Sequence, residues 1–475
     1  MKKLITVISI FCYFFCFGAI SAQNNQLKKS IDSLLQNKFF KRAQISVSAI
    51  DLTTGKEIYT LNDQKLFRPA SVQKLYTTAA AIKFLGTERK FKTAVYADGS
   101  ILNGTLNGNV FIKGGFDPDF TTKDLDSLIK QIILSGINKI NGNIYADVSM
   151  MDSLFWGEGW MWDDDPYSFA AYFSPLTIND NSIKIIVEPT QLKKKPLVRT
   201  EPGTEIFDVQ NSALVNKGYR NRLTVTRKWL NRSNKIIVKG TIGVTGKTYS
   251  TSLNIFNPTL YFLELFREKC TNAGISISGK LDTLKTPNNL RELANYERKV
   301  DVIINNVNKA SDNLSAELLL RSIPFHKTGD KAGAAEGKKY VERLISFLDE
   351  NPESYSIVDG SGLSYYNLSS TGLTTKLLQH MYYSSPEAYS LFYNSLSISG
   401  IDGTLRNRLN SHELKGKVRG KTGSLRGTTT LSGYLQTSIN KNVAFSIFIQ
   451  NFVGNQNKPK NLVDEIVRLI YKHHN

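Results

Sequence analysis

The two ends of the 475-residue chain carry the same strand-rich pattern, which ties them to one sheet. Residues 44–50 alternate apolar and polar side chains, and after a turn residues 57–61 complete a hairpin. Near the other end, residues 417–425, 428–437 and 442–451 predict three successive antiparallel strands. If these segments pair, they form a five-strand antiparallel sheet covered by helices, which predicts a domain of the α+β class.

The region between these ends has a different character. Residues 89–290 are rich in strand-like alternation and Gly/Asn turns, with helices expected only near 122–134 and 259–273. We therefore expect a large β-rich insertion that splits the α+β domain and forms either one elongated domain or, as we favour, two subdomains. The predicted parts are a signal peptide (1–22), the first catalytic part (23–88), the insertion (89–290) and the second catalytic part (291–475).

The first residues indicate export. Lys2 and Lys3 precede an apolar run over residues 4–20, and the small residues Ser21 and Ala22 follow. This order is typical of a secretory signal that is cleaved after Ala22, although a retained N-terminal anchor is the alternative. We expect an exported protein of the periplasm or cell envelope that is soluble after cleavage and has at most peripheral membrane association.

The charge points to an anionic environment. The chain has 60 basic and 41 acidic residues, a net charge of +19, and removal of Lys2 and Lys3 leaves +17. Nucleic acid is not the expected partner, because the basic residues are dispersed and form no stripe with interleaved aromatic residues.

The scarcity of His and Cys narrows the chemistry. The chain has 5 His and 3 Cys, and Cys12 and Cys16 lie within the signal, so Cys270 alone remains. We expect no internal disulfide, no cysteine zinc site, no metal and no cofactor. No Ser has the G-x-S-x-G spacing, which makes a Ser-His-Asp triad improbable. The remaining way to activate a serine is a lysine whose neutral amine accepts the proton.

Such a pair is present at Ser71-Val72-Gln73-Lys74. A spacing of three places both side chains on one face of the helix predicted over residues 71–85. The uncharged stretch 75–82 indicates that this helix is buried, where a lysine is costly unless it has a function. The alternative is a helix-capping Ser beside a solvated Lys.

Two further motifs complete a candidate site. Ser311-Asp312-Asn313 precedes a helical stretch and provides a hydroxyl and a carboxamide that could take part in the site. The alternative is that these residues only cap the helix. The S-x-N pattern also occurs at 252–254 and 438–440. Lys421-Thr422-Gly423 lies in a predicted strand, whereas the second K-T-G, at 327–329, lies in a polar loop. On an edge strand, Lys421 and Thr422 can hold a carboxylate, and the backbone N–H groups of Ser71 and Ser424 can hold an oxyanion.

In this order the three motifs resemble the signature of penicillin-binding proteins and class A β-lactamases. The resemblance implies that the α+β domain is a catalytic domain with the penicillin-binding or serine β-lactamase-like fold. The whole mature chain resembles the class C low-molecular-mass penicillin-binding proteins, the D-alanyl-D-alanine carboxypeptidase/endopeptidase family S13. The long gap between Lys74 and Ser311 fits the insertion that distinguishes this family. Ser424 departs from its pattern, which more often has Thr. Supporting stretches are residues 114–118, 160–167, 179–181, 359–364 and 403–405.

The resemblance implies a mechanism without metal or cofactor. Ser71 attacks the carbonyl between the last two D-alanines of a peptidoglycan stem peptide, with Lys74 as its base, and water hydrolyses the acyl-enzyme. Cleavage of D-alanyl-diaminopimelate cross-links is also implied, and β-lactams should acylate Ser71. The remaining roles are proton transfer to the leaving amine by Ser311, amide binding by Asn313, and carboxylate binding by Lys421 and Thr422.

One acidic cluster suggests a substrate contact. Asp163-Asp164-Asp165 lies among aromatic residues that include Phe169. We expect Asp164 and Phe169 to meet the cationic end of a diaminopimelate side chain, and the alternative is a solvated turn beside buried aromatics.

Two other functions stay open at this point. A β-lactamase-like hydrolase would share the acylation machinery but deacylate β-lactams quickly, and the long insertion argues against it. A non-catalytic wall-binding protein could use the same fold, and the intact Ser71, Lys74, Ser311 and Lys421 argue against that. The expected partners are peptidoglycan stem peptides, their cross-links and β-lactam antibiotics.

Overall fold

The computed structural model describes residues 26–437 and 441–474, which pack into two compact units. Of the described residues, unit 1 comprises 26–83, 305–311, 341–437 and 441–474, and unit 2 comprises Phe84–Ile304 and Asp312–Tyr340. The predicted signal peptide and the S-x-N copy at 438–440 lie outside the described residues. Within the described part of the chain, no helix combines the length and the apolar character that crossing a membrane requires.

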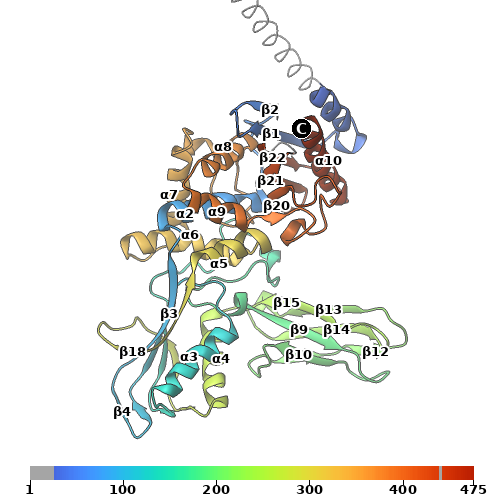
Figure 1. Cartoon of the computed structure of the whole chain (residues 1–475). Helices are drawn as coiled ribbons and strands as arrows, with labels where there is room; N and C mark the ends of the chain where they lie inside the picture. Colours follow the sequence, from blue (N-terminus) through green and yellow to red (C-terminus); the bar gives the residue numbers. More distant parts are fainter. Residues whose placement is uncertain (1–25, 438–440, 475) are drawn as a thin grey trace, which may run out of the picture. The chain divides into compact units, whose positions relative to one another are not determined.

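Unit 1 is built on an antiparallel sheet with strand order β19-β20-β21-β22-β1-β2 (Figure 1). All five predicted strands are present, and both ends of the chain contribute to the sheet because β1 pairs with β22 along its whole length. The two-residue strand β19 adds a sixth member that its short sequence did not predict. The strands are β1 (Gln44–Asp51), β2 (Glu57–Leu61), β19 (Ser397–Ile398), β20 (Val418–Leu425), β21 (Thr428–Gln436) and β22 (Asn442–Gln450).

Helices cover both faces of this sheet, and the alternation along β1 explains which side chains meet them. Ser46 and Ser48 bond to Thr371 and Thr375 of α8 at 2.6 and 2.9 Å. The alternate residues, among them Val47, join the apolar core formed with residues 26–35 and with α10. The helices of this part of the chain are α8 (Thr371–Tyr382), α9 (Pro386–Ser395) and α10 (Asn457–His473). Helix α7 (Ala334–Ser346) has residues in both units, because unit 2 extends to Tyr340.

Two helical segments carry the candidate motifs. The helix predicted over residues 71–85 begins as a 3-10 turn, η2 (Ala70–Val72), and continues as α2 (Gln73–Leu85), whose first ten residues are buried. The second segment starts with α5 (Val300–Asn305), continues as the π-helix η6 (Asn306–Ala310) and resumes as α6 (Asn313–Thr328). Both motif serines therefore lie where regular helix is interrupted.

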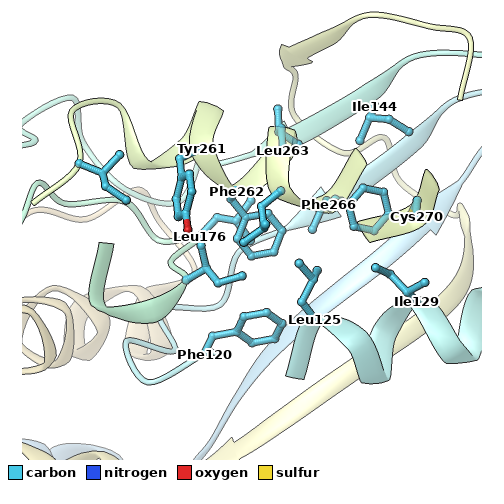
Figure 2. Close-up of a cluster of buried hydrophobic side chains, with 14 of the residues drawn as sticks. Phe120, Leu125, Ile129, Ile144, Leu176, Tyr261, Phe262, Leu263, Phe266 and Cys270 are labelled. Carbon is cyan, nitrogen blue, oxygen red and sulfur yellow. The ribbon is translucent and has the colours of Figure 1, made fainter. Parts of the chain in front are cut away.

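Unit 2 is β-rich, as predicted, and one of its cores lies between a mixed sheet and two helices. The sheet has strand order β17-β8-β6-β3-β18, and Phe262 and Phe266 of α4 pack in the same buried cluster as Leu125 and Ile129 of α3 (Figure 2). Its elements, with those of a small neighbouring sheet, are β3 (Lys90–Ala97), β4 (Ser100–Leu102), β5 (Thr105–Asn107), β6 (Val110–Lys113), α3 (Thr122–Leu134), β7 (Lys139–Ile140), β8 (Ile144–Asp147), α4 (Pro258–Asn272), β16 (Ser276–Ile277), β17 (Leu281–Thr283) and β18 (Arg291–Lys299).

The boundary predicted at residue 290 differs from this packing. Strand β18 pairs with β3 over residues 291–299, so residues up to Ile304 belong to unit 2, as does the segment Asp312–Tyr340. The sequence of β18 is largely charged and polar, which is why alternation did not reveal it.

The rest of unit 2 includes a module of residues 182–254, here named the β9–β15 module. It contains a three-stranded sheet, β10-β9-β15, and a second sheet in which β11, β12 and β13 all pair with β14. Its strands are β9 (Ser182–Glu188), β10 (Leu197–Glu201), β11 (Val209–Asn211), β12 (Leu214–Asn216), β13 (Arg222–Arg227), β14 (Ile236–Gly243) and β15 (Tyr249–Asn254).

Candidate active site

Ser71 lies in a turn that neighbouring backbone holds from two sides. Ala70, just before it, has a φ of 47°, an uncommon conformation for a residue with a side chain. A Cβ on Gly423 would lie 2.9 Å from the Ser71 backbone nitrogen, and a Cβ on Gly362 would lie 1.8 Å from the Ala70 carbonyl oxygen. Both positions therefore require glycine, because strand β20 and the loop around Gly362 approach the turn at backbone distance.

Lys74 contacts Ser71 as the spacing predicted. Its Nζ donates to Ser71 Oγ at 3.1 Å and to the carbonyl oxygen of Ser361 at 2.7 Å. The Lys74 side chain is fully buried, whereas Ser71 is partly exposed. The alternative of a solvated lysine is therefore wrong, and the amine lies within proton-transfer distance of the hydroxyl.

A buried carboxylate orders the loop that positions Lys74. Asp359 accepts hydrogen bonds from the backbone N–H groups of Gly362 and Ser364 and from Asn367 Nδ2, each at 2.7 Å. These bonds fix the loop so that the Ser361 carbonyl faces the amine of Lys74. The sequence singled out residues 359–364 only through the family resemblance, because the bond to Lys74 spans 287 positions.

Ser311 and Lys421 form the second contact of the site. Ser311 directly follows the π-helix η6 as its C-cap residue and has a φ of 64°. Lys421 Nζ donates to Ser311 Oγ at 2.7 Å and to the Thr422 carbonyl oxygen at 2.9 Å. Burial, together with the nearby cation of Lys74, holds the pKa of Lys421 well below the usual range of a lysine.

Both serines and the K-T-G strand line one pocket of about 390 Å³ in unit 1. Thr422 is partly exposed and donates from Oγ1 to Thr404 Oγ1 at 2.8 Å, and Ser424 is exposed. The pocket also has two cationic residues that the sequence analysis missed. Its lining consists of Ser71, Ser311, Thr404, Arg408, Thr422, Ser424 and Lys460.

Arg408 and Lys460 lie at the edge of the predicted site. The Arg408 guanidinium donates to both carboxylate oxygens of Asp464, at 2.6 and 3.3 Å, which fixes its position in the pocket wall. Neither residue belongs to a motif or has a distinctive spacing. No sequence signal available for a single chain pointed to them.

The remaining predicted residues lie in unit 2. Asp312 is the N-cap of α6 and accepts from Ser315 N at 2.6 Å, which leaves Asn313 on the first turn with its Nδ2 donating to the Phe169 carbonyl oxygen at 2.7 Å. The Phe169 ring stacks on Tyr167 with centroids 5.6 Å apart and is 46% exposed. The structure thus brings Asn313 and Phe169 together.

The acidic cluster divides into two different environments. Asp165 is buried and forms an ion pair with Arg227, so it is not part of a solvated turn. Asp164 ends the 3-10 turn η3 (Trp162–Asp164), and its carboxylate accepts from Met161 N at 3.0 Å. Burial, with the neighbouring charge of Asp163, raises the pKa of Asp164.

The described alternative copies of the motifs have structural roles. Asn254 bonds to Arg227 and to the Ala170 carbonyl oxygen inside unit 2. The polar loop expected at 327–329 is wrong, because Lys327 and Thr328 end α6 and Gly329 caps its C-terminus with a φ of 77°. Residues 26–437 and 441–474 contain no cluster of three or more His, Cys, Asp or Glu side chains placed to hold a metal ion.

Comparisons with known proteins identify the family of the chain. The model of the D-Ala-D-Ala carboxypeptidase 3 (S13) family matches residues 27–472. A D-alanyl-D-alanine carboxypeptidase of Actinomadura sp. (strain R39) is 28% identical over 434 residues, covering 88% of this chain and 80% of that protein. D-alanyl-D-alanine carboxypeptidase DacB of Haemophilus influenzae is 27% identical over 425 residues, covering 88% of each chain.

The fold comparison covers almost the whole chain. The crystal structure of penicillin-binding protein 4 (dacB) from Haemophilus influenzae superposes with a TM-score of 0.82 at 25% identity, covering 94% of this chain and 99% of that one. The predicted fold class and family are confirmed, and the chain belongs to the D-Ala-D-Ala carboxypeptidase 3 (S13) family of serine-type carboxypeptidases.

Proposed function

We propose that this chain removes the terminal D-alanine from peptidoglycan stem peptides through an acyl-enzyme on Ser71. The observation that carries the proposal is the contact between the partly exposed Ser71 hydroxyl and the buried Lys74 amine at 3.1 Å. The printed names of the relatives, D-alanyl-D-alanine carboxypeptidases, support the substrate class.

In the first step, the neutral amine of Lys74 accepts the proton of Ser71 Oγ while Oγ attacks the carbonyl carbon of the penultimate D-alanine. The backbone N–H groups of Ser71 and Ser424 stabilise the oxyanion. Ser311 then relays the proton that Lys74 took from Ser71 to the nitrogen of the leaving D-alanine, and the C–N bond breaks. Ser311 thereby keeps a hydroxyl, and Lys74 is a neutral amine again. Water hydrolyses the ester and restores the Ser71 hydroxyl.

The terminal carboxylate of the substrate is held by Lys421 and Thr422. Lys421 Nζ donates to Ser311 Oγ at 2.7 Å, and Thr422 Oγ1 donates to Thr404 Oγ1 at 2.8 Å. The carboxamide of Asn313 binds a stem-peptide amide, a role supported by its position next to the Phe169 backbone.

The edge of the sheet supports binding of an extended peptide. In the described residues, β19 pairs with β20 only at Arg419 and Gly420, so the backbone edge of residues 421–425 stays open to a ligand strand. A peptide lying along this edge would add its own backbone hydrogen bonds to the sheet. Because Gly423 has no side chain, strand β20 lies close to the backbone of Ser71.

The proposal also includes cleavage of the D-alanyl-diaminopimelate cross-links of peptidoglycan. Asp164 and Phe169 contact the cationic end of a diaminopimelate side chain, since burial disfavours the Asp164 carboxylate and an ammonium group beside it would restore its charged form. Asp164→Lys should lower cross-link cleavage more than release of D-alanine from a free stem peptide. Unchanged cross-link cleavage in a digest of muropeptides would contradict this contact.

The proposal also includes export to the cell envelope and removal of residues 1–22. Residues 2–22 have the order of a secretory signal. The mass of the protein recovered from the envelope fraction tests this, because a mature chain that begins at Gln23 is expected.

Intact-mass spectrometry with benzylpenicillin tests the site assignment. The wild-type protein should gain one covalent adduct, and Ser71→Ala should gain none while retaining its melting temperature. An adduct that persists for many minutes separates a D,D-peptidase from a β-lactamase-like hydrolase, which would release it quickly. A folded wild-type protein that gains no adduct would support the non-catalytic alternative.

A further inference from the structure

The expectation that the basic residues are dispersed along the chain is wrong for one part of unit 2, where the excess positive charge is concentrated. The β9–β15 module, residues 182–254, contains 14 Lys and Arg against 4 Asp and Glu, a net charge of +10 out of the +19 of the whole chain. Four of these cations form ion pairs: Lys184, Arg199, Arg227 and Lys235. Most of the excess charge of the protein therefore lies on fewer than a sixth of its residues, and most of it is not neutralised by ion pairs.

Three segments of the module meet at one end, near β12 (Figure 1). Lys193 N donates to the Val215 carbonyl oxygen, which places the loop after β9 beside β12. Thr245 N donates to the Gly218 carbonyl oxygen, and Asn221 Nδ2 donates to that of Lys247, which ties the loop after β14 to the loop after β12. We name this end the basic tip; it comprises residues 190–195, 214–221 and 244–247.

The basic tip carries six exposed cations and no acidic residue. None of the six forms an ion pair with any carboxylate in the part of the chain that the structure describes, and a surface of this kind attracts polyanions over about a Debye length. The six are Lys193, Lys194, Lys195, Lys217, Arg220 and Lys247.

Exposed apolar side chains lie among these cations. Tyr219 is 68% exposed and Leu214 is 49% exposed, and Leu192 and Val244 are exposed by 37% and 38%. Tyr219 is flanked in sequence by Lys217 and Arg220, and the Arg220 guanidinium lies 5.7 Å from its ring centroid. An aromatic ring with a polar end, set beside basic and aliphatic side chains, is typical of surfaces that enter the headgroup layer of a bilayer.

We propose that the basic tip docks on a bilayer of anionic phospholipids. The cations contribute long-range attraction and the four apolar side chains enter the interface, so two independent kinds of interaction act at the same place. A hydrophilic anionic polymer would use the cations but would leave the apolar side chains in water, which is why the observations favour a lipid surface. This inference does not depend on the chemistry proposed for Ser71.

Vesicle sedimentation of the mature protein, beginning at Gln23, tests the proposal. Wild-type protein should bind vesicles of phosphatidylglycerol and phosphatidylethanolamine at low salt, bind less at high salt, and not bind vesicles of phosphatidylcholine. The variant Lys194→Glu/Lys217→Glu/Lys247→Glu, with one change in each segment, should lower the affinity for anionic vesicles more than about tenfold.

A matched control separates the tip from overall charge. Lys28→Glu/Lys29→Glu/Lys41→Glu changes three exposed lysines of unit 1 and shifts the net charge equally, and it should alter binding by less than about twofold. Tyr219→Ser keeps every charge and should weaken the binding that persists at high salt. Unchanged melting temperatures and benzylpenicillin adducts would show that all variants are folded.

Three outcomes would overturn the proposal. The first is wild-type protein that does not bind anionic vesicles, and the second is equal loss of binding in the tip variant and the control. The third is binding of isolated peptidoglycan that the tip variant loses while neither protein binds vesicles, which would assign the basic tip to a wall polymer.

Discussion

The two units bury cations in different ways. In unit 2, Arg227, Arg321 and Arg298 each pair with a buried carboxylate, those of Asp165, Glu317 and Asp117. In unit 1, the buried amine of Lys74 donates to a hydroxyl and a carbonyl oxygen, and Lys421 forms no ion pair with any carboxylate of residues 26–437 and 441–474.

Burial without a counter-charge is unfavourable for an ammonium group, whereas a matched pair recovers much of that cost. The buried pairs of unit 2 are therefore part of its folding, whereas burial of the charged form of Lys421 in unit 1 opposes folding and serves the chemistry of the site. This contrast predicts that substitutions at the two kinds of site separate activity from stability.

Loss of the Lys74 amine should give the largest effect. Lys74→Met removes the proposed base but keeps a buried chain of similar length, so acylation by benzylpenicillin should slow by about a thousandfold or more. The melting temperature should stay equal or rise, because a buried amine is replaced by an apolar group. Acylation rates from timed mass spectra and thermal melts measure both quantities, and a destabilised but active variant would break the contrast between the units.

Loss of one partner of a unit 2 pair should have the opposite signature. Asp165→Asn leaves the Arg227 guanidinium buried without its counter-charge, which should lower the free energy of unfolding by about 3 to 5 kcal/mol. Glu297→Gln, which breaks an exposed pair with Lys90, is the matched control and should cost less than about 1 kcal/mol. Denaturant melts give both values, and the folded fraction of each variant should still react with benzylpenicillin.

The pH dependence of substrate capture tests the role of Lys421. A carboxylate is held by the charged ammonium form, and burial lowers the pKa of Lys421 well below its usual value. The rate constant kcat/KM for D-alanyl-D-alanine peptides should therefore fall about tenfold per pH unit as the pH rises through this lowered pKa. Between that pKa and the usual one, the unfolded chain binds more protons, so stability rises with pH over the same window.

Lys421→Arg is the control for this profile, since a guanidinium keeps its charge throughout. Its activity will be lower, but the alkaline fall should disappear. If the fall stays in place, it comes from another group.

A variant of His326 in unit 2 tests whether a shifted pKa is enough to identify a functional residue. Burial and the nearby charge of Arg89 lower its pKa to about 4. Because the unfolded side chain titrates higher, stability should be lost as the pH falls from about 6.5 toward 4. His326→Phe, which fits beside the rings of Phe91 and Phe325, should remove about 3 kcal/mol of that acid loss without changing acylation. A fall in acylation would extend the functional region into unit 2.

Much of the catalytic unit follows from local sequence patterns. The alternation of β1, β2 and the last three strands predicts the sheet, and the spacing of Ser71 and Lys74 predicts their contact. The exact backbone at the serines does not follow, because the 3-10 turn at Ser71 and the π-helix before Ser311 depend on packing by distant segments.

The parts that escaped prediction depend on contacts over long sequence separations. Ser361 reaches Lys74 only through the loop that Asp359 orders, and Arg408 is held in the pocket wall by Asp464 of α10. Strand β18 is polar and pairs with β3 about 200 positions away, so its membership in unit 2 has no local signature.

The close approach of Gly362 and Gly423 to the Ser71 turn has a consequence for how the enzyme can change over generations. Every missense change of a glycine codon adds at least one carbon atom, so at both positions all substitutions displace the nucleophile. Substrate and β-lactam are proposed to react with that same hydroxyl. A substitution at Gly362 or Gly423 that prevents the reaction with β-lactams would therefore also prevent the reaction with substrate. Substitutions that give resistance and keep activity are expected at other positions of the pocket.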